Sequence, residues 1–397
     1  MELENTINLI TIKEHKIFHH CKKPITYLKA CIILPAKDEA VTITHTLTSL
    51  KNQVYFDGGK LDYSIYEVLL LVNNCTDNTY LLAKEFALQN PEFNLHIASI
   101  NIPAPNANIG YVRRILMEEA CHRLSVYNSA NGIIVSTDSD TIADKYWLGH
   151  IMNEIVDGYD AVGGRILTNK KNDAARIYYL RDISYRLLLA TATSIIENNK
   201  KNIINRHHQY FGASMAITCD TYKRCGRLPD VTHLEDMALL NSLIKIDAKI
   251  CYSSLAKVYT STRTEGRVEI GFSEQLKKWE ELKNNNTLQF VESVRAGLMK
   301  LECKKILRRC FELFRSNQII ELQFLKIISK DLMISQYWLQ QQLMKAIYFG
   351  ALWQATELEI CKGKFYEQYQ SIPVTMAIKE LRFFLNNHQT FSKTSNL

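Results

Sequence analysis

The 397-residue sequence predicts an α/β fold with a mostly parallel sheet that has helices on both faces, followed by a C-terminal α-helical region. Short continuous apolar runs alternate with stretches of helical spacing through about the first 160 residues, a pattern typical of buried parallel strands joined by helices. From residue 272 onward almost only helical spacing remains. We therefore expect an N-terminal extension over 1–29, an α/β domain over 30–271 and a helical region over 272–397.

The apolar runs have the lengths and boundaries of strands. Residues 30–35 are closed by a proline, and residues 66–72 end in turn-forming residues. Helical spacing follows these runs over 38–51 and 79–89. The alternation continues with a strand near 94–99, a helix near 108–125, a strand at 132–137, helices near 144–156 and 173–198, and an apolar stretch at 210–218. Ligands of such sheets bind beyond the carboxyl ends of the strands, where we expect the functional residues.

Composition indicates a soluble globular protein, with 47% hydrophobic and 22% charged residues. The ten cysteines include no C-x-x-C pair and several lie in apolar runs, which favours reduced thiols over zinc ligands. No basic N-terminal region precedes an apolar stretch, and no run reaches the roughly 20 apolar residues of a spanning helix. We expect a cytoplasmic protein that can lie against the inner membrane.

The net charge of +7 comes from the C-terminal part of the chain. Residues 276–397 hold 18 Lys and Arg against 11 Asp and Glu, whereas the remainder balances at 30 against 30. The densest cluster is Lys304, Lys305, Arg308 and Arg309. Such a cluster is usually a solvated helix face, but it also suits an anionic membrane surface or an acidic acceptor. We expect either peripheral membrane contact or a homodimer through these helices, and no nucleic acid.

Two carboxylates follow the predicted strand at 132–137. Asp138 and Asp140 would stand at the carboxyl end of that strand, and oxygen ligands of this kind suit Mg²⁺ or Mn²⁺, which keeps waters and substrate phosphates in its shell. A D-x-D pair that only caps the next helix is the alternative. The spacing therefore indicates a metal site without establishing one.

The order of the motifs resembles that of family 2 glycosyltransferases with the Rossmann-like GT-A fold, over about residues 28–275. The run from Leu34 to Glu39 is similar to the family's P-x-x-x-E stretch beside the nucleotide. The run from Val72 to Thr79 is similar to the family's D-D-x-S-x-D-x-T stretch, which holds the base. Here Asn73 and Asn74 replace the leading aspartates, and because an amide can both donate and accept, the identity of the base stays open.

The next motifs of the family follow in order. Gly110 and Arg113 open a helix as in the family's G-x-x-x-A-R segment, where a guanidinium and a helix N-terminus would favour phosphate. After the D-x-D pair, the run from Gly212 to Ala216 is similar to the G-x-N-x-A turn beside the transferred sugar, with serine in place of asparagine. The run from Thr260 to Arg263, with Gly266 and Arg267, looks like a donor-side loop of bacterial members.

Glu235 and Asp236 resemble the family's E-D motif, whose aspartate acts as the catalytic base. The resemblance implies metal-dependent transfer of a hexosyl group from a nucleotide-sugar donor to an acceptor hydroxyl, with inversion, by Asp236 or else Glu235. Asp140, with Asp138, would hold the Mg²⁺ or Mn²⁺. The implied donor-binding residues are Pro35, Ala36, Asp38, Glu39, Asn73, Asn74, Arg113, Asp138, Gly212 and Ala213.

Other readings stay open. Retaining relatives share the fold, and the third metal ligand that some members take from a downstream histidine is missing, because no histidine occurs between His233 and His388. A nucleotidyltransferase would carry a glycine-rich loop after the first strand, and a dinucleotide-dependent oxidoreductase would carry G-x-G-x-x-G; neither is found. An inactive carbohydrate-binding scaffold is the remaining alternative.

Overall fold

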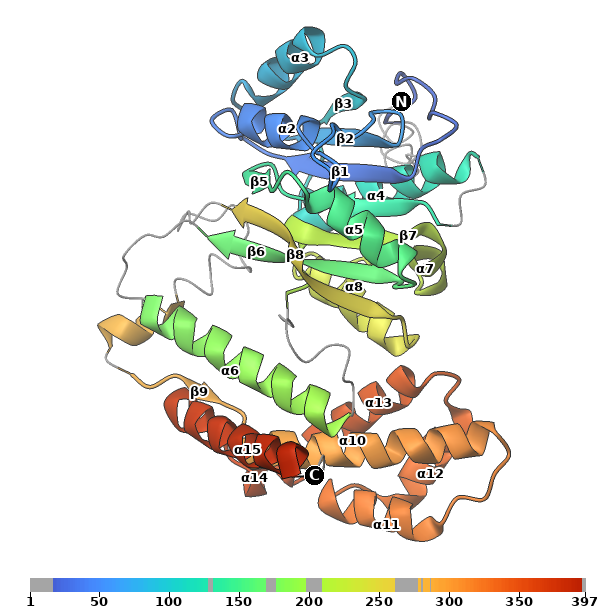
Figure 1. Ribbon diagram of the computed structural model, residues 1–397, viewed down its shortest axis with the longest axis vertical. Helices are drawn as coiled ribbons and strands as arrows, with labels where there is room; N and C mark the ends of the chain where they lie inside the picture. The colour runs from blue at the N-terminus through green and yellow to red at the C-terminus, as the bar shows by residue number, and fades with distance from the viewer. Residues whose placement is uncertain are drawn as a thin grey trace, which may run out of the picture. The chain divides into compact units, whose positions relative to one another are not determined.

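The computed structural model describes residues 17–127, 131–168, 176–197, 209–260, 278–279, 281–285 and 287–394. The chain divides into two compact units, which Figure 1 shows with their elements labelled. The first comprises Met1–Lys171, Gln209–Leu243 and Ala248–Ser273; the second comprises Asn172–His208, Ile244–Asp247 and Glu274–Leu397.

The first unit contains an eight-stranded sheet in the order β3-β2-β1-β4-β7-β6-β8-β5. Its strands are β1 (Ala30–Ala36), β2 (Tyr66–Asn73), β3 (Leu95–Ile100), β4 (Ile133–Ser136), β5 (Thr141–Ala143), β6 (Ala161–Thr168), β7 (Met215–Thr218) and β8 (Ile250–Thr260). β1 to β4 pair in parallel, as do β6 and β8. β7 runs antiparallel to both β4 and β6, and β5 runs antiparallel to β8. The predicted mostly parallel α/β sheet is confirmed.

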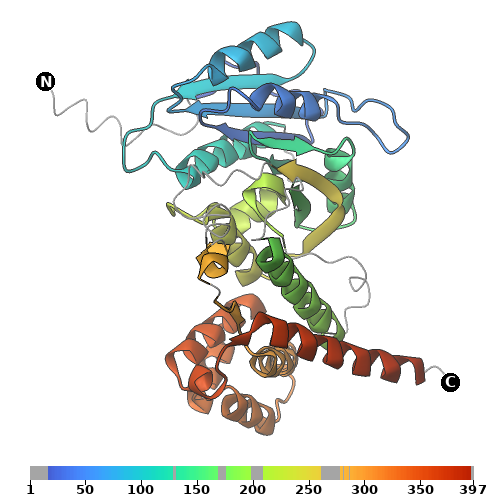
Figure 2. The ribbon, with the colours of Figure 1, turned by 90° about the vertical axis from the view of Figure 1, so that its left-hand side faces the viewer.

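Helices cover both faces of this sheet. Alternate residues of β1, β2 and β4 share a hydrophobic core with α2 (Ile43–Lys51), α3 (Thr79–Gln89) and α5 (Trp147–Val156). The intervening residues of β1, such as Cys31 and Ile33, are also fully buried, and α4 (Ile109–Ser125) packs on β1, β2 and β4. Figure 2 shows this layering from a second direction. Because both faces are covered, these strands are continuously apolar, which is the pattern that made them predictable.

Three short elements complete the described part of the first unit: the 3-10 turn η3 (Gly212–Ser214), α7 (Cys219–Arg224) and α8 (Glu235–Lys245), the last of which ends in the second unit. The helix expected over 38–51 begins only at Ile43, because Asp38 adopts a left-handed conformation with φ of 51° at the end of β1.

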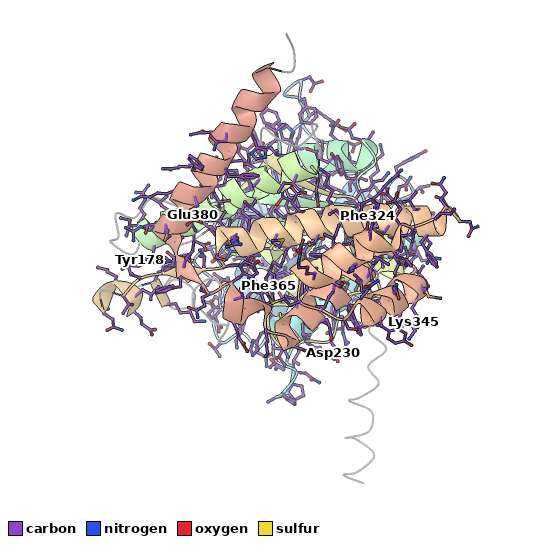
Figure 3. The ribbon with its side chains drawn as sticks, turned by 90° about the horizontal axis from the view of Figure 1, so that it is seen from below. Tyr178, Asp230, Phe324, Lys345, Phe365 and Glu380 are labelled. Carbon is purple, nitrogen blue, oxygen red and sulfur yellow. The ribbon has the colours of Figure 1, made fainter. Side chains whose placement is uncertain are left out.

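The second unit is helical, as predicted for the C-terminal region, and it also contains α6 (Arg176–Ile196). Its other elements are α10 (Val294–Arg315), α11 (Leu322–Asp331), α12 (Gln336–Lys345), α13 (Phe349–Lys362), α14 (Phe365–Gln368), α15 (Val374–Thr394) and the short pair β9 (Phe290–Val291) and β10 (Ile372–Pro373). Phe365 is fully buried in the core formed by α10 to α14, and Phe324 packs against that core; both are labelled in Figure 3. Among the described helices, none has the length and apolar character needed to cross a bilayer. The three-segment domain division stays a prediction.

Candidate active site

The carboxyl end of β4 is tied to the turn η3 by side-chain hydrogen bonds. Ser136 Oγ donates to the carbonyl oxygen of Gly212 at 2.9 Å, and Thr137 Oγ1 donates to that of Ala213 at 2.9 Å. The antiparallel pairing of β4 with β7 places η3, which directly precedes β7, beside the end of β4. The D-x-D loop and the Gly212 turn, 72 residues apart by number from Asp140 to Gly212, therefore meet at one edge of the sheet.

Arg113 connects this edge to the start of α8. Its Nε donates to Glu235 Oε1 at 3.0 Å, and its Nη2 donates to Asp138 Oδ1 at 3.0 Å. Nη1 donates to the carbonyl oxygen of Gly212 at 3.1 Å and to Ser136 Oγ. The guanidinium is almost fully buried, with 3% of the side chain exposed. One side chain thus brings together the D-x-D loop, the Gly212 turn and the E-D helix.

Two glycines allow these close approaches. A Cβ atom on Gly212 would lie 2.3 Å from Arg113 Nη2, which is closer than any real Cβ contact, so only glycine leaves room for the guanidinium. A Cβ atom on Gly110 would lie 2.1 Å from the carbonyl oxygen of Val231, in the loop that leads to α8. Both glycines of the motifs are therefore required by packing around Arg113 and α4.

Asp236 is held at the N-terminus of α8 by backbone amides. The N–H of Gly212 donates to Asp236 Oδ2 at 3.1 Å, and the N–H of Met237 donates to Oδ1 at 2.7 Å. Burial raises the pKa of Asp236, and the neighbouring Glu235 carboxylate raises it further, against the opposing effects of Arg113 and the two amides. A carboxylate with a raised pKa is a better proton acceptor than an exposed aspartate. Glu235 is instead buried and occupied by Arg113.

Asp138 and Asp140 offer oxygen ligands at the end of β4. Burial and the nearby Asp140 carboxylate raise the pKa of Asp138, whereas Arg113 lowers it. About a third of the Asp138 side chain is exposed, at 36%, although one of its oxygens is taken by Arg113. Two partly accessible carboxylates suit a hard divalent cation that completes its shell with water and diphosphate oxygens. These oxygen ligands fit Mg²⁺ or Mn²⁺. Of the two carboxylates, Asp138 is the one that accepts a hydrogen bond from Arg113.

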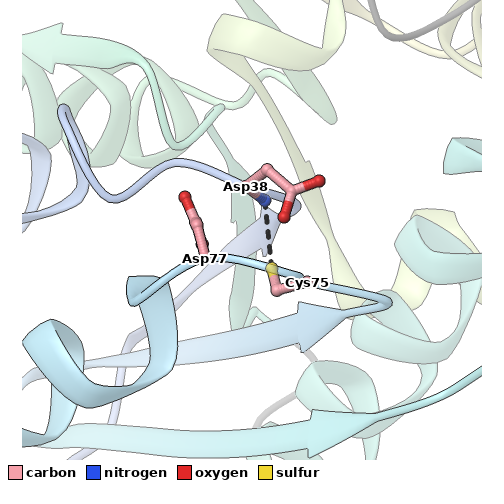
Figure 4. A group of neighbouring side chains, drawn as sticks. All are labelled: Asp38, Cys75 and Asp77. Atoms are coloured by element: carbon pink, nitrogen blue, oxygen red, sulfur yellow. Dashed lines mark hydrogen bonds between the residues drawn. The ribbon is translucent and has the colours of Figure 1, made fainter.

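A second group of potential ligands lies where β1 and β2 end. Figure 4 shows Asp38, Cys75 and Asp77 close together, with their potential ligand atoms within 4.8 Å of one another, and among the described residues they form the one set of three or more such side chains. The N–H of Asp38 donates to Cys75 Sγ at 3.0 Å, Thr76 donates to Asp38 Oδ1 at 2.6 Å, and Ala40 donates to Asp77 Oδ2 at 2.9 Å. These bonds tie the two predicted nucleotide-binding loops together, which accounts for the cluster without a metal ion.

The other predicted donor residues occupy the same strand ends. Asn74 has φ of 49°, and its amide exchanges two hydrogen bonds with the backbone of Ile102, at 2.9 and 3.2 Å. Its side chain therefore holds the loop after β3. Asn73 ends β2 and is buried. Glu39 accepts a hydrogen bond of 2.6 Å from Thr42, ahead of α2, while Pro35 and Ala36 end β1.

Two residues of the site had no signal in the sequence. Ser136 and Thr137 read only as strand residues, yet they anchor η3. Ser214, at the motif's usual asparagine position, accepts from Trp147 Nε1 at 2.9 Å in the buried interior, so its hydroxyl serves packing. His233 lies two residues before Glu235, and its buried Nδ1 has no hydrogen-bond partner among the described residues. The predicted donor-side loop begins at Thr260, the last residue of β8, and the rest of it, up to Arg267, lies outside the described residues.

Comparison with known proteins finds one matching family model. Residues 31–219 match the model of glycosyl transferase family 2. No curated protein gives a significant match. The similar solved structures include three enzymes.

Staphylococcus aureus TarS 1–349 with UDP has a TM-score of 0.43 and 13% identity, covering 84% of this chain and 92% of that chain. The mannosyltransferase PcManGT of Pyrobaculum calidifontis with GDP-Man and Mn²⁺ has a TM-score of 0.40 and 14% identity, covering 95% of this chain and 90% of that chain. Glucosyl-3-phosphoglycerate synthase of Mycobacterium tuberculosis with Mn²⁺, UDP and phosphoglyceric acid has a TM-score of 0.39 and 17% identity, covering 66% of this chain and 83% of that chain.

Proposed function

Because residues 31–219 of this chain match the model of glycosyl transferase family 2, we propose that the protein transfers a hexosyl group from a nucleotide-sugar donor to an acceptor hydroxyl, with a divalent metal and with inversion. The observation that carries the proposal is the convergence on Arg113. This side chain joins the D-x-D loop, the Gly212 turn and the E-D helix, so the expected metal, sugar and base positions lie around one buried cation.

The D-x-D loop would receive the diphosphate end of the donor. Asp140, with the accessible part of Asp138, would hold Mg²⁺ or Mn²⁺, which supplies charge stabilisation for the departing diphosphate. Arg113 orients Asp138 through its Nη2, and with at least four hydrogen bonds inside the protein it acts as a positioning residue. Direct contact of Arg113 with a phosphate stays a prediction.

Asp236 would accept the proton of the acceptor hydroxyl as that hydroxyl attacks the anomeric carbon. Its raised pKa supports this role, and the amides of Gly212 and Met237 fix the direction of its carboxylate. Glu235 is the weaker candidate, because its Oε1 accepts from Arg113. Carbonyl oxygens of η3 accept hydrogen bonds from Ser136 and Thr137 at the end of β4. The turn that orients Asp236 is therefore fixed by the strand that carries the D-x-D loop.

The test replaces Asp236 with asparagine, which keeps the shape and one acceptor oxygen. Release of nucleoside diphosphate from UDP- and GDP-sugars with Mn²⁺ should fall about 10²–10⁴-fold, the usual contribution of a general base. Thermal stabilisation by UDP or GDP with Mn²⁺ should persist, because donor binding does not need the base. The control is Asp230→Asn, an exposed aspartate of the preceding loop, which should keep full turnover. Undiminished turnover in Asp236→Asn would exclude this residue as the base.

The finer assignments have their own tests. The anomeric configuration of the product, read by NMR, distinguishes inversion from retention. A nucleotidyltransferase would release pyrophosphate from a nucleoside triphosphate and a sugar phosphate, and an inactive scaffold would bind a nucleotide sugar without consuming it. Asn73 and Asn74 leave the base open, so uridine and guanosine donors belong in the same screen. Contact with a membrane or a second copy through the C-terminal helices stays a prediction.

A further inference from the structure

The outward side of α11 combines aliphatic side chains with lysines. Leu322 is 63% exposed, Ile327 is 46% exposed, and Ile319, just before the helix, is 92% exposed. Lys326 and Lys330 are exposed between them. Residues 322, 326 and 330 are spaced by four, so they share one side of the helix. We call these five residues the α11 face.

The opposite side of the same helix is fully used in packing. Leu325 and Ile328 are buried at 2% and 0% exposure in the core shared with α10, α12 and α13. The orientation of α11 is therefore fixed by its own core contacts, and the α11 face cannot turn inward. A helix that needed only to be soluble would carry polar residues on its outer side, whereas here three aliphatic side chains face out.

The α11 face itself carries two lysines and no acidic residue, although the acidic Glu321 and Asp331 flank it in the sequence. Neither Lys326 nor Lys330 has an ion-pair partner within the described part of the chain, whereas Lys300 pairs with Glu292 at 2.6 Å and Lys362 with Glu359 at 3.1 Å. Residues 304–345 hold eight Lys and Arg against three Asp and Glu. The potential around α11 is therefore positive, and the lysines are available to an external anion.

We propose that the α11 face docks on an anionic lipid bilayer. Interleaved lysines and aliphatic side chains are what an interfacial helix presents, because the lysines meet the headgroups while the aliphatic groups enter the acyl boundary. A soluble anionic polymer would use the lysines but leave the aliphatic groups in water. Pairing of two α11 faces would bring four lysines together, which like-charge repulsion opposes. This inference does not rest on the proposed reaction.

The test uses the full chain with sonicated vesicles of phosphatidylcholine, with and without phosphatidylglycerol, in a sedimentation assay. The protein should bind only the anionic vesicles, and binding should weaken as salt is added. Lys326→Gln with Lys330→Gln should weaken binding about 25-fold, at about fivefold for each lysine near an anionic surface. Leu322→Ser with Ile327→Ser should weaken it about tenfold or more through lost apolar burial.

The matched control is Lys379→Gln with Arg382→Gln, two exposed residues of α15 in the same unit. This pair removes the same charge elsewhere and should leave binding within about twofold, while circular dichroism shows all variants folded. If the control variant lost as much vesicle binding as the lysine variant, the proposal would be overturned. Absence of binding to the anionic vesicles would also overturn it. An unchanged affinity in the serine pair, or a dimer that the serine pair converts to a monomer, would likewise overturn it.

Discussion

Replacement of Arg113 by methionine tests the central interaction of the site. Methionine keeps an unbranched stem, shorter than that of arginine, and removes the charge and all the donors. Glu235 would then be left charged and 6% exposed, 3.0 Å from the place of its lost partner, and stranding one member of a buried ion pair costs about 3–5 kcal/mol. The pair with Asp138 adds at most about 1 kcal/mol, since that carboxylate is partly solvated. The carbonyl of Gly212 keeps its bond from Ser136. We expect a loss of about 4 kcal/mol in the free energy of unfolding.

Urea unfolding followed by circular dichroism measures this loss, and hydrogen exchange of α8 and η3 shows whether the opening is local to the first unit. The double variant Arg113→Met/Glu235→Gln should regain about 1–3 kcal/mol, because the stranded charge is gone. Arg114→Met is the matched control on the same helix: its ion pair with Asp230 is 3.3 Å long, and the Asp230 partner is 76% exposed, so the substitution should cost no more than about 1 kcal/mol. A loss below 1 kcal/mol in Arg113→Met, or no recovery in the double variant, would refute this reasoning.

Two further predictions concern charge. The pKa of Glu67 is lowered to about 2, because hydrogen bonds and ion pairs with Arg123 and His96 outweigh its burial. The ionised Glu67 therefore stabilises the folded protein by about 3 kcal/mol above pH 4.5, and this stabilisation is lost as the pH falls toward 2. Acid unfolding curves should show this slope in the native protein and in Glu85→Gln, an exposed control, but not in Glu67→Gln. For the metal site, EDTA should abolish nucleoside diphosphate release, and Mn²⁺ should restore it in the native protein but not in Asp140→Asn. Restoration in that variant at the same Mn²⁺ concentration would contradict the assignment of Asp140.

The parallel half of the fold was predictable because its signals are local. β1 and β2 are buried on both faces, so their runs are continuously apolar, and the helices between them show their own spacing. The direction of β7 was not predictable, because a four-residue apolar run has the same pattern in either direction. Its antiparallel pairing nevertheless decides that η3 lies beside β4, and thus where the Gly212 turn meets the D-x-D loop.

The site was predictable as a set of motifs but not as a set of contacts. Nothing near Arg113 in the sequence shows that its partner is Glu235, 122 residues away, so the sequence suggested phosphate binding without revealing the buried ion pair. Asn74 is similar: its position suggested base recognition, which stays a prediction, but nothing in the sequence showed that its amide bonds to the backbone of Ile102 in the loop after β3. Long-range pairing of polar groups leaves no periodic trace in a sequence, because only apolar faces repeat with the helix or strand period.

The charges around Arg113 give a physical reason for a cation at the D-x-D loop. Asp138, Glu235 and Asp236 all act on this one guanidinium, and Asp140 acts on Asp138. Four carboxylates against one positive charge leave an excess of three negative charges if all are ionised. Burial is the main cause of the raised pKa values of Asp138 and Asp236, and the neighbouring carboxylates raise them further against the opposing effect of Arg113. A diphosphate would add further negative charge to the same place. We therefore expect donor binding to depend on the divalent ion, with nucleoside diphosphate stabilising the protein against heat in the presence of Mn²⁺ and far less in its absence.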